Sequence, residues 1–455
     1  MTVPDHGLDP ALALDGGALS LAWALPFAGL LLSIALLPAL APRLWHRHAG
    51  IVAAAWVLAF LVPCVARFGV DVAAYQVVRV ELLDFLPFIL LIGALYTVTG
   101  GIRITGTVGG TPLTNTGVLA LGTLLASLMG TTGAAMLLIR PLLRANRGRR
   151  HRVHVVVFFI FLVANIGGAL SPLGDPPLFL GFLQGVDFFW TTRHLLAPTA
   201  LTVAVLLALF FAIDLWCWRL VPTAEDVPER EPWGLAGGAN VGLLAAITGA
   251  LLLQALWHPG LSVSVLRVGV AVEKLAADLL LLAVTVASLR LIPMAQRRPN
   301  AFSWRPLTEV TILFGAIFVT IVPAMAILQA GSDGAAAPLL AVPSRDGRPD
   351  DALYFWMTGL LSSLLDNAPT YLIFFQAAGG DAPTLMTGGA STLAAISAGA
   401  VFMGAMTYIG NVPNMLVKTI AEEQGVPLPG FFGYMVWSSC LLLPLFAVLT
   451  LVFFR

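Results

Sequence analysis

LLASLMGTTGAAMLLI (Leu124–Ile139) and LLSSLLDNAPTYLIFF (Leu360–Phe375) align without a gap, and their first residues are 236 positions apart. A second pair of segments, SPLGDPP (Ser171–Pro177) and TYIGNVP (Thr407–Pro413), has the same offset. One offset shared by two separate pairs indicates a single duplicated unit. Each copy holds two apolar segments interrupted by Gly, Pro and polar residues, which is the pattern of the substrate site in transporters built from repeats.

The composition is that of a membrane protein. Of the 455 residues 58% are hydrophobic and only 11% are charged, against roughly 45–50% and about 25% in soluble domains. The 24 basic and 24 acidic residues balance, so nothing favours binding to nucleic acid. Three scattered cysteines, Cys64, Cys217 and Cys440, form neither a disulfide framework nor a metal site. We expect an integral membrane protein in contact with the lipid bilayer, without a cofactor.

The apolar runs predict an all-α polytopic fold with about ten crossings, because about 20 apolar residues are needed to cross a bilayer. These runs cover 21–41, 49–68, 83–101, 153–184, 195–219, 238–257, 270–292, 308–330, 390–420 and 430–454. Two further apolar segments, about 117–140 and 354–376, are interrupted near their middle and are expected to form re-entrant hairpins.

Five crossings in each copy would place the second copy upside down, so we expect two inverted-topology repeats. The first repeat covers 1–219, and a hydrophilic segment, 220–236, is the expected cytoplasmic linker to the second repeat at 237–455. Each repeat has one hairpin and one broken, unwound transmembrane helix, at about 153–184 in the first and about 390–420 in the second.

Loop charges predict the orientation, since short cytoplasmic loops collect Lys and Arg. The densest basic cluster follows the first hairpin: Arg140, Arg144, Arg147, Arg149, Arg150 and Arg152. With this loop in the cytoplasm, Arg43 and Arg47 and the group from Arg290 to Arg305 also lie inside, and the N-terminus lies outside. We interpret all these arginines as topology signals and not as ligands. The first twenty residues lack the basic region of a signal peptide, so we expect a retained first span and a bacterial inner membrane.

The four interrupted segments are the candidate site. Pro and Gly unwind a membrane helix and free backbone carbonyls, which coordinate cations together with hydroxyls, carboxamides and carboxylates. Half-helix N-termini at the same breaks attract anions. The breaks alone therefore do not decide whether the substrate is a cation or an anion. The candidate cation- and proton-binding residues are Asp366, Asn367, Asp175, Asn411, Ser363, Thr131, Thr132, Asn165, Ser171, Thr407 and Asn414. The candidate helix-breaking residues are Gly130, Gly133, Gly174, Pro176, Pro177, Pro369, Gly410 and Pro413.

Two carboxylates favour a cation. Asp175 and Asp366 lie in the middle of apolar segments with no Lys or Arg nearby in sequence, and an acid inside a membrane is by default a functional residue. Burial makes a carboxyl group easier to protonate and a bound cation makes it harder, which is the basis of proton/cation exchange. We therefore expect both aspartates to hold the transported metal ion, sodium. A third acid, Asp278, is expected to pair with Lys274 instead, since the two are spaced i, i+4.

SSLLDNAP and NIGGALSPLGDPP are similar to the hairpin and unwound-helix segments of the sodium/proton branch of the ion-transporter superfamily. This superfamily contains the NhaD-type sodium/proton antiporters, the arsenite permeases and the citrate and divalent-anion transporters. The resemblance implies two inverted repeats, a homodimer and an elevator movement of the hairpin-containing domain. The carboxylate branch has Ser-Asn-Thr at both hairpin tips, whereas this chain has Gly130–Thr132 and Asp366–Ala368.

The expected function is therefore secondary active transport, as a sodium or similar monovalent cation/proton antiporter with alternating access. The alternative is a sodium-coupled symporter of citrate or a related carboxylate, which the half-helix N-termini favour and the two acids oppose. An intramembrane aspartyl protease would need Gly-x-Gly-Asp, but this chain reads Pro172–Asp175 and contains no Tyr-Asp pair. A channel would need a continuous wet pore. We expect no enzymatic activity.

Overall fold

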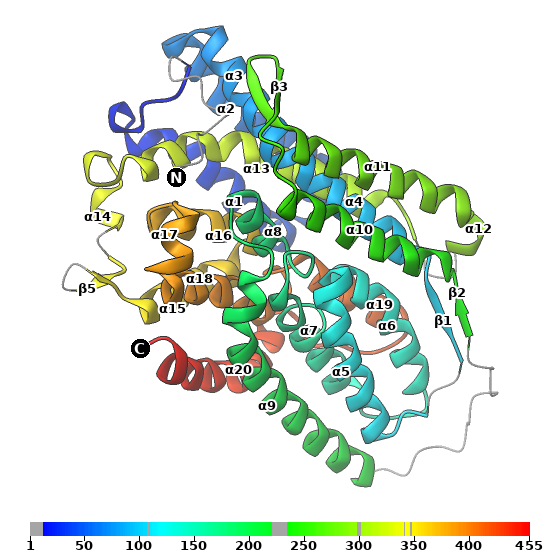
Figure 1. Cartoon of the computed structure of the whole chain (residues 1–455). Helices are drawn as coiled ribbons and strands as arrows, with labels where there is room; N and C mark the ends of the chain where they lie inside the picture. Colours follow the sequence, from blue (N-terminus) through cyan, green and yellow to red (C-terminus); the bar gives the residue numbers. More distant parts are fainter. Residues whose placement is uncertain (1–11, 107–108, 221–233, 298–301, 341, 346–347) are drawn as a thin grey trace.

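The computed structural model describes residues 12–106, 109–220, 234–297, 302–340, 342–345 and 348–455. Within these residues the chain is a bundle of α-helices with three short two-stranded sheets (Figure 1). Most of the predicted linker, and the first eleven residues, lie outside the described residues.

The helices of the first half alternate between long spans and short broken segments. They are α1 (Leu25–Leu40), α2 (Pro42–Phe68), α3 (Val70–Val80), α4 (Leu86–Gly100), α5 (Pro112–Met129), α6 (Thr131–Ala145), α7 (Val153–Leu162), α8 (Pro176–Leu183) and α9 (Trp190–Leu220). A π-helical turn, η3 (Glu81–Phe85), joins α3 to α4 without a break, and a 3-10 turn, η4 (Ile166–Leu170), follows α7. Two more 3-10 turns precede α1, η1 (Gly16–Ala18) and η2 (Leu21–Ala24).

The second half has the same alternation. Its helices are α10 (Ala239–Leu256), α11 (Val272–Leu291), α12 (Met294–Arg297), α13 (Arg305–Gln329), α14 (Ala337–Leu340), α15 (Asp351–Leu364), α16 (Asn367–Ala377), α17 (Ala382–Thr387), α18 (Ala390–Met403), α19 (Val412–Glu423) and α20 (Phe431–Phe453). The 3-10 turns are η6 (Gly331–Asp333) and η7 (Gly404–Met406). The strand pairs are β1 (Arg103–Thr105) with β2 (Gly234–Ala236), β3 (Ser262–Val265) with β4 (Val268–Ala271), and β5 (Ser344–Arg345) with β6 (Arg348–Pro349), all antiparallel.

In the described part of the chain, nine helical segments are long and apolar enough to cross a membrane. They include α5, which the sequence predicts as a hairpin arm. They omit α11, which has the length but carries Glu273, Lys274, Asp278 and Arg290. Large apolar side chains such as Leu32, Ile51 and Val436 are more than half exposed, as expected for surfaces that face lipid. The chain is thus an all-α polytopic membrane protein.

Both predicted helix interruptions are observed. Residues 171–175 separate η4 from α8, and residues 407–411 separate η7 from α19. Each connection is non-helical: its first and last residues are extended, and the residues between them form turns or bends. The predicted hairpins correspond to α5 and α6, joined at Gly130, and to α15 and α16, joined at Leu365 and Asp366. Gly130 has φ +80°, which only glycine adopts without strain. Re-entry from one membrane face and inverted topology stay predictions.

The helices form two neighbouring groups, with the cavity described below between them. In Figure 1, α4, α10 and α11 lie side by side, and α5, α6, α7 and α9 form a separate group with the broken helices. Helices α4 and α13 contact each other and also contact α6, α8 and α16 of the second group. The interruptions therefore lie where the two groups meet.

Arg297 corrects the interpretation of every basic loop residue as a topology signal only. Its side chain is fully buried and donates to the carbonyls of Thr97, Ser288 and Ile292, at the C-terminal ends of α4 and α11. Helix C-termini carry partial negative charge and unpaired carbonyls. The Arg297 guanidinium therefore joins the ends of α4 and α11, and backbone carbonyls take the place of a carboxylate partner.

Candidate functional site

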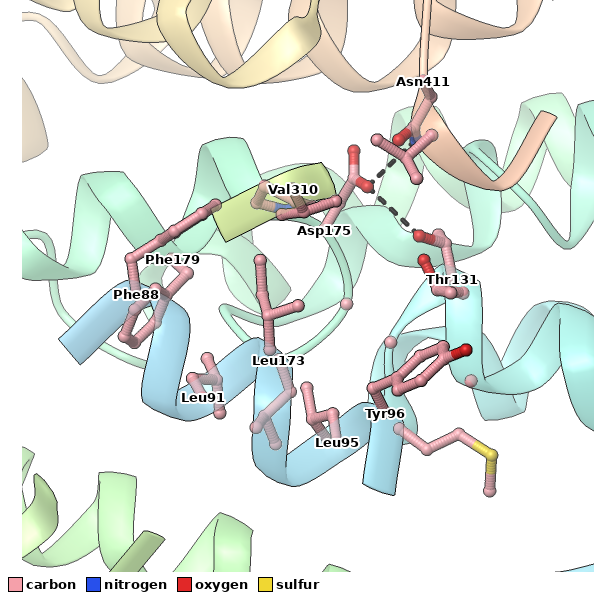
Figure 2. Close-up of a pocket in the computed structure, with 18 of the residues that line it drawn as sticks. Phe88, Leu91, Leu95, Tyr96, Thr131, Leu173, Asp175, Phe179, Val310 and Asn411 are labelled. Atoms are coloured by element: carbon pink, nitrogen blue, oxygen red, sulfur yellow. Dashed lines mark hydrogen bonds between the residues drawn. The ribbon is translucent and has the colours of Figure 1, made fainter. Parts of the chain in front are cut away.

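Asp175 is the centre of the candidate site. Its side chain is only 2% exposed, and it is the N-cap residue of α8 without capping that helix through its side chain. Instead the carboxylate accepts three hydrogen bonds from three other segments. Asn411 Nδ2 and Thr131 Oγ1 donate to Oδ1 at 3.1 and 3.2 Å, and Asn367 Nδ2 donates to Oδ2 at 2.6 Å. One acid thus joins both hairpin tips and both broken helices. Figure 2 shows its bonds to Asn411 and Thr131.

The pair Asp175 and Asn411 are 236 residues apart and touch each other. They are the positions that the predicted duplication pairs, and both have extended backbone before a half-helix, at φ −145° and −155°. The next equivalent pair behaves alike: Ser171 Oγ donates to the carbonyl of Ser127, and Thr407 Oγ1 donates to that of Ser363 at 2.6 Å. These matched contacts support the duplicated unit, and they place its two copies face to face at Asp175.

Asn165 and Asn414 bind the two breaks together next to this pair. Asn165 Nδ2 donates to Asn414 Oδ1 at 2.7 Å, and Asn411 Nδ2 lies 3.3 Å from Asn165 Oδ1. Asn414 in turn donates to the carbonyls of Gly404 and Thr407 at 2.9 Å. All three asparagines are buried. The carboxamides therefore satisfy the carbonyls that unwinding leaves free, which is required away from water.

A cavity of about 100 Å³ opens onto Asp175, room for several water molecules, since one needs roughly 10–15 Å³. Figure 2 shows its two unlike walls. One comes from the interruptions and α8 and α19, and it holds the polar residues Thr131, Thr132, Asp175, Asp366 and Asn411 beside apolar ones that include Leu173, Phe179 and Val412. The other is apolar and comes from α4 and α13: Phe88, Leu91, Ile92, Leu95, Pro306, Leu307, Val310 and Phe314, with Tyr96 at one end.

The second hairpin tip contributes Asp366 and Asn367. Asp366 is half-buried and caps α16 through a bond from the Ala368 amide to Oδ1, at 3.2 Å. Asn367 is fully buried, and its Oδ1 has no hydrogen-bond partner. A buried carbonyl oxygen without a donor is costly. This oxygen is therefore a candidate ligand for the transported cation that the sequence predicts.

Other predicted residues have more local positions. Thr132 lines the cavity, and Ser363 Oγ donates within its own helix to the carbonyl of Leu360. Pro176, Pro177 and Pro413 begin the half-helices α8 and α19, as predicted. Pro369 lies in the first turn of α16, where proline is tolerated.

Gly133 was predicted wrongly as a break. It lies inside α6, where an added Cβ would be 2.7 Å from Thr99 Cγ2 of α4. Close helix packing explains this glycine. Gly174 and Gly410 do belong to the breaks: their Cβ atoms would lie 2.1 and 2.7 Å from the carbonyl oxygens of Gly168 and Gly404, again at equivalent positions.

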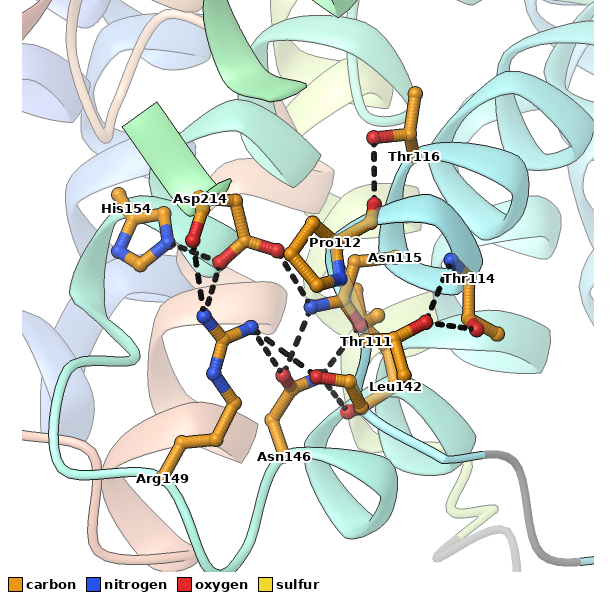
Figure 3. Close-up of polar contacts among 11 residues, drawn as sticks. Thr111, Pro112, Thr114, Asn115, Thr116, Leu142, Asn146, Arg149, His154 and Asp214 are labelled. Carbon is orange, nitrogen blue, oxygen red and sulfur yellow. Dashed lines mark hydrogen bonds and ion pairs between the residues drawn. The ribbon is translucent and has the colours of Figure 1, made fainter. Parts of the chain in front are cut away.

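Sequence reasoning missed a buried polar cluster beside the first hairpin. Asp214 Oδ1 lies 2.5 Å from Arg149 Nη2 and 2.8 Å from His154 Nε2, while Asn115 Nδ2 donates to Oδ2 at 2.9 Å (Figure 3). Asn115 and Asn146 also exchange two amide hydrogen bonds. The cluster fastens α5 and α6 to α9. Asp214 inside an apolar span was the available signal, and Arg149 is a second exception to the topology interpretation.

Among the described residues Lys274 and Asp278 of α11 form no direct ion pair. The charge of Lys274 nevertheless acts on Asp278, as the i, i+4 spacing predicts. Asp278 is 8% exposed. Nothing connects it to the cavity.

Residues 16–454, nearly the whole chain, match a protein family described as "Putative citrate transport". The chain belongs to this family. It is consistent with the wider ion-transporter superfamily, in which citrate and divalent-anion transporters are one branch. Among curated proteins, no sequence matches the chain. Family and membrane helices together make it a secondary transporter.

Proposed function

We propose that this transporter exchanges sodium, or a similar monovalent cation, for protons. The observation that carries the proposal is the charge of the cavity. Among the described residues, its lining contains two carboxylates, Asp175 and Asp366, and no Lys, Arg or His. A carboxylate substrate would meet two acids without a compensating cation, whereas a cation or a proton would neutralise them.

The capping of α16 is a second argument. A helix N-terminus attracts anions because its first amides lack partners. At α16 the protein's own Asp366 already occupies this position. The second hairpin tip therefore has an internal anion where a substrate carboxylate would bind. The first tip differs, since α6 begins at Gly130 without a side-chain cap.

Alternating access by an elevator movement is part of the proposal. The cavity lies between α4 and α13 on one side and the hairpins with the broken helices on the other. Its apolar wall offers few hydrogen bonds to hold the polar wall in one place. We further propose a homodimer in a bacterial inner membrane with the N-terminus outside, as the resemblance and the loop charges imply.

The second candidate is symport of citrate with sodium, and the family match favours it. The start of α6 has no side-chain cap, although the Thr131 amide donates to the Gly174 carbonyl at 2.9 Å. The amides that follow Thr131 are the place where a substrate carboxylate would bind. In this mechanism sodium would neutralise the two acids and the substrate would bind next to the ion.

Flux measurements separate the two candidates. Purified protein is reconstituted in vesicles with a pH gradient, and lumenal pH is followed while Na⁺, Li⁺, K⁺ or citrate is added. We expect Na⁺ or Li⁺ alone to release the gradient. Protein-free vesicles are the control. A response that requires citrate would reject exchange and favour symport.

A further inference from the structure

Four phenylalanines cross-pack between the two long helices of the apolar wall. Phe88 of α4 stacks on Phe314 of α13, with ring centroids 4.7 Å apart, and packs edge-on against Phe318 at 5.6 Å. Phe85, in the π-helical turn η3, packs against Phe318 at 6.1 Å. We call Phe85, Phe88, Phe314 and Phe318 the phenylalanine cluster.

The cavity ends at this cluster. Phe88 and Phe314 line the cavity. Phe85, one turn before Phe88, and Phe318, one turn after Phe314, do not line it. Phe88 and Phe314 are 0% and 4% exposed, whereas Val412, which follows Asn411 in the lining, is 40% exposed. The rings therefore close the cavity at this end, and the cavity is more open near Val412.

The open end lies toward the basic loop. The lining residues beyond the centre are Tyr96, Pro306 and Leu416, near the C-terminal end of α4 and the start of α13. On that side the loop after α19 is joined to the basic loop, because Arg152 Nη2 donates to the carbonyl of Gly425 at 2.9 Å. The loop charges predict that this is the cytoplasmic side.

The closed end has a polar contact behind the rings. Asp84, in η3, accepts a hydrogen bond at 3.1 Å from Gln184, which ends the half-helix that Asp175 begins. Glu81 lies one turn farther from the cavity. Asp84, Gln184 and Glu81 therefore lie on the far side of the phenylalanine cluster. The four rings separate them from Asp175 and Asp366.

We propose that the phenylalanine cluster is the hydrophobic barrier that closes the transport path on the side away from the basic loop. Apolar constrictions stop ions and protons because water does not remain in them. The cluster keeps the two carboxylates accessible from one side only, which is the condition for coupled exchange instead of a leak.

Cysteine labelling tests this barrier. Cys64, Cys217 and Cys440 are first replaced by alanine, and single reporters are placed at Leu307, in the cavity, and at Glu81, beyond the cluster. A membrane-impermeant thiol reagent is added to one side of oriented vesicles without the transported cation. We expect Leu307→Cys to react at least about tenfold faster from the basic-loop side, and Glu81→Cys from the opposite side. Equal rates from both sides at Leu307→Cys would overturn the proposal.

A cluster variant gives the second readout. Phe88→Ala should let the reagent reach Leu307→Cys from both sides and should raise cation-independent proton leak by about tenfold or more. Phe88→Leu, which keeps most of the volume, should do neither. Phe210→Ala, at a buried ring outside the cavity, is the control for loss of a core phenylalanine. Leak in Phe210→Ala equal to that in Phe88→Ala would also overturn the proposal.

The inference rests on the proposed transport function only where leak is measured. Labelling of the unaltered cluster needs no Phe88 variant and does not depend on which species is carried. If sidedness is found but sodium drives no proton flux, the barrier stands and the exchange proposal fails. If Leu307→Cys reacts equally from both sides while sodium drives normal proton flux, the barrier proposal fails and the exchange proposal stands.

Discussion

Asp366→Asn is expected to abolish exchange while the protein still folds and inserts. Asparagine is as good a helix N-cap as aspartate, so the start of α16 should keep its bond to the Ala368 amide. What is lost is the charge, and with it a cation ligand and a proton carrier. We expect cation-driven proton flux to fall by about 100-fold or more, a loss in the range found when metal-site groups are removed.

Asp381→Asn is the matched control. Asp381 caps α17 through the Thr384 amide at 3.0 Å, in the same way that Asp366 caps α16, but it is exposed and far from the lining of the cavity. This variant should transport normally. Flux is compared at equal amounts of reconstituted protein. Normal flux in Asp366→Asn would remove Asp366 from the site.

Asp175→Asn is expected to cost stability as well as transport. The carboxylate has two oxygens, and both accept from amide or hydroxyl donors. An asparagine has one oxygen, so its own NH₂ group would face the NH₂ of Asn367 or Asn411. A buried donor left unpaired costs about 1–3 kcal/mol. The melting temperature in detergent should fall, and flux should disappear.

Exchange of the two equivalent residues is the control. Asp175→Asn combined with Asn411→Asp keeps one carboxylate and one carboxamide in the contacting pair, so it should recover most of the melting temperature. Transport should return only in part, since Thr131 and Asn367 would face a carboxamide instead of a carboxylate. An unchanged melting temperature in Asp175→Asn would show that the three hydrogen bonds to Asp175 do not stabilise the purified protein.

Part of the site could be predicted because its residues break local rules. Asp175 and Asp366 are acids in apolar segments, and Pro176 and Pro413 are prolines where a helix would otherwise continue. Such features are visible in a sequence without any knowledge of packing. The constant offset also related Ser171 to Thr407, and the structure gives these two residues the same hydrogen bond.

The remainder depends on packing between distant segments. An offset of 236 shows that Asp175 and Asn411 are equivalent, but not that they touch. Arg149 and Arg297 lie in polar, loop-like stretches of the sequence, and only the fold shows that they are buried. Gly133 resembles a break in sequence, yet it serves close packing against Thr99.

The central claim is that cations and protons compete for Asp175 and Asp366. The most direct measurement is sodium affinity of the purified protein between roughly pH 5.5 and 9, a window that includes carboxyl groups buried away from water, with and without citrate. Two ligands of one site must weaken each other by the same factor. We predict that affinity rises with pH, by up to about tenfold per unit where one proton is displaced, and that citrate has no effect. A sodium affinity that stays constant across this range but increases sharply with citrate would contradict the account.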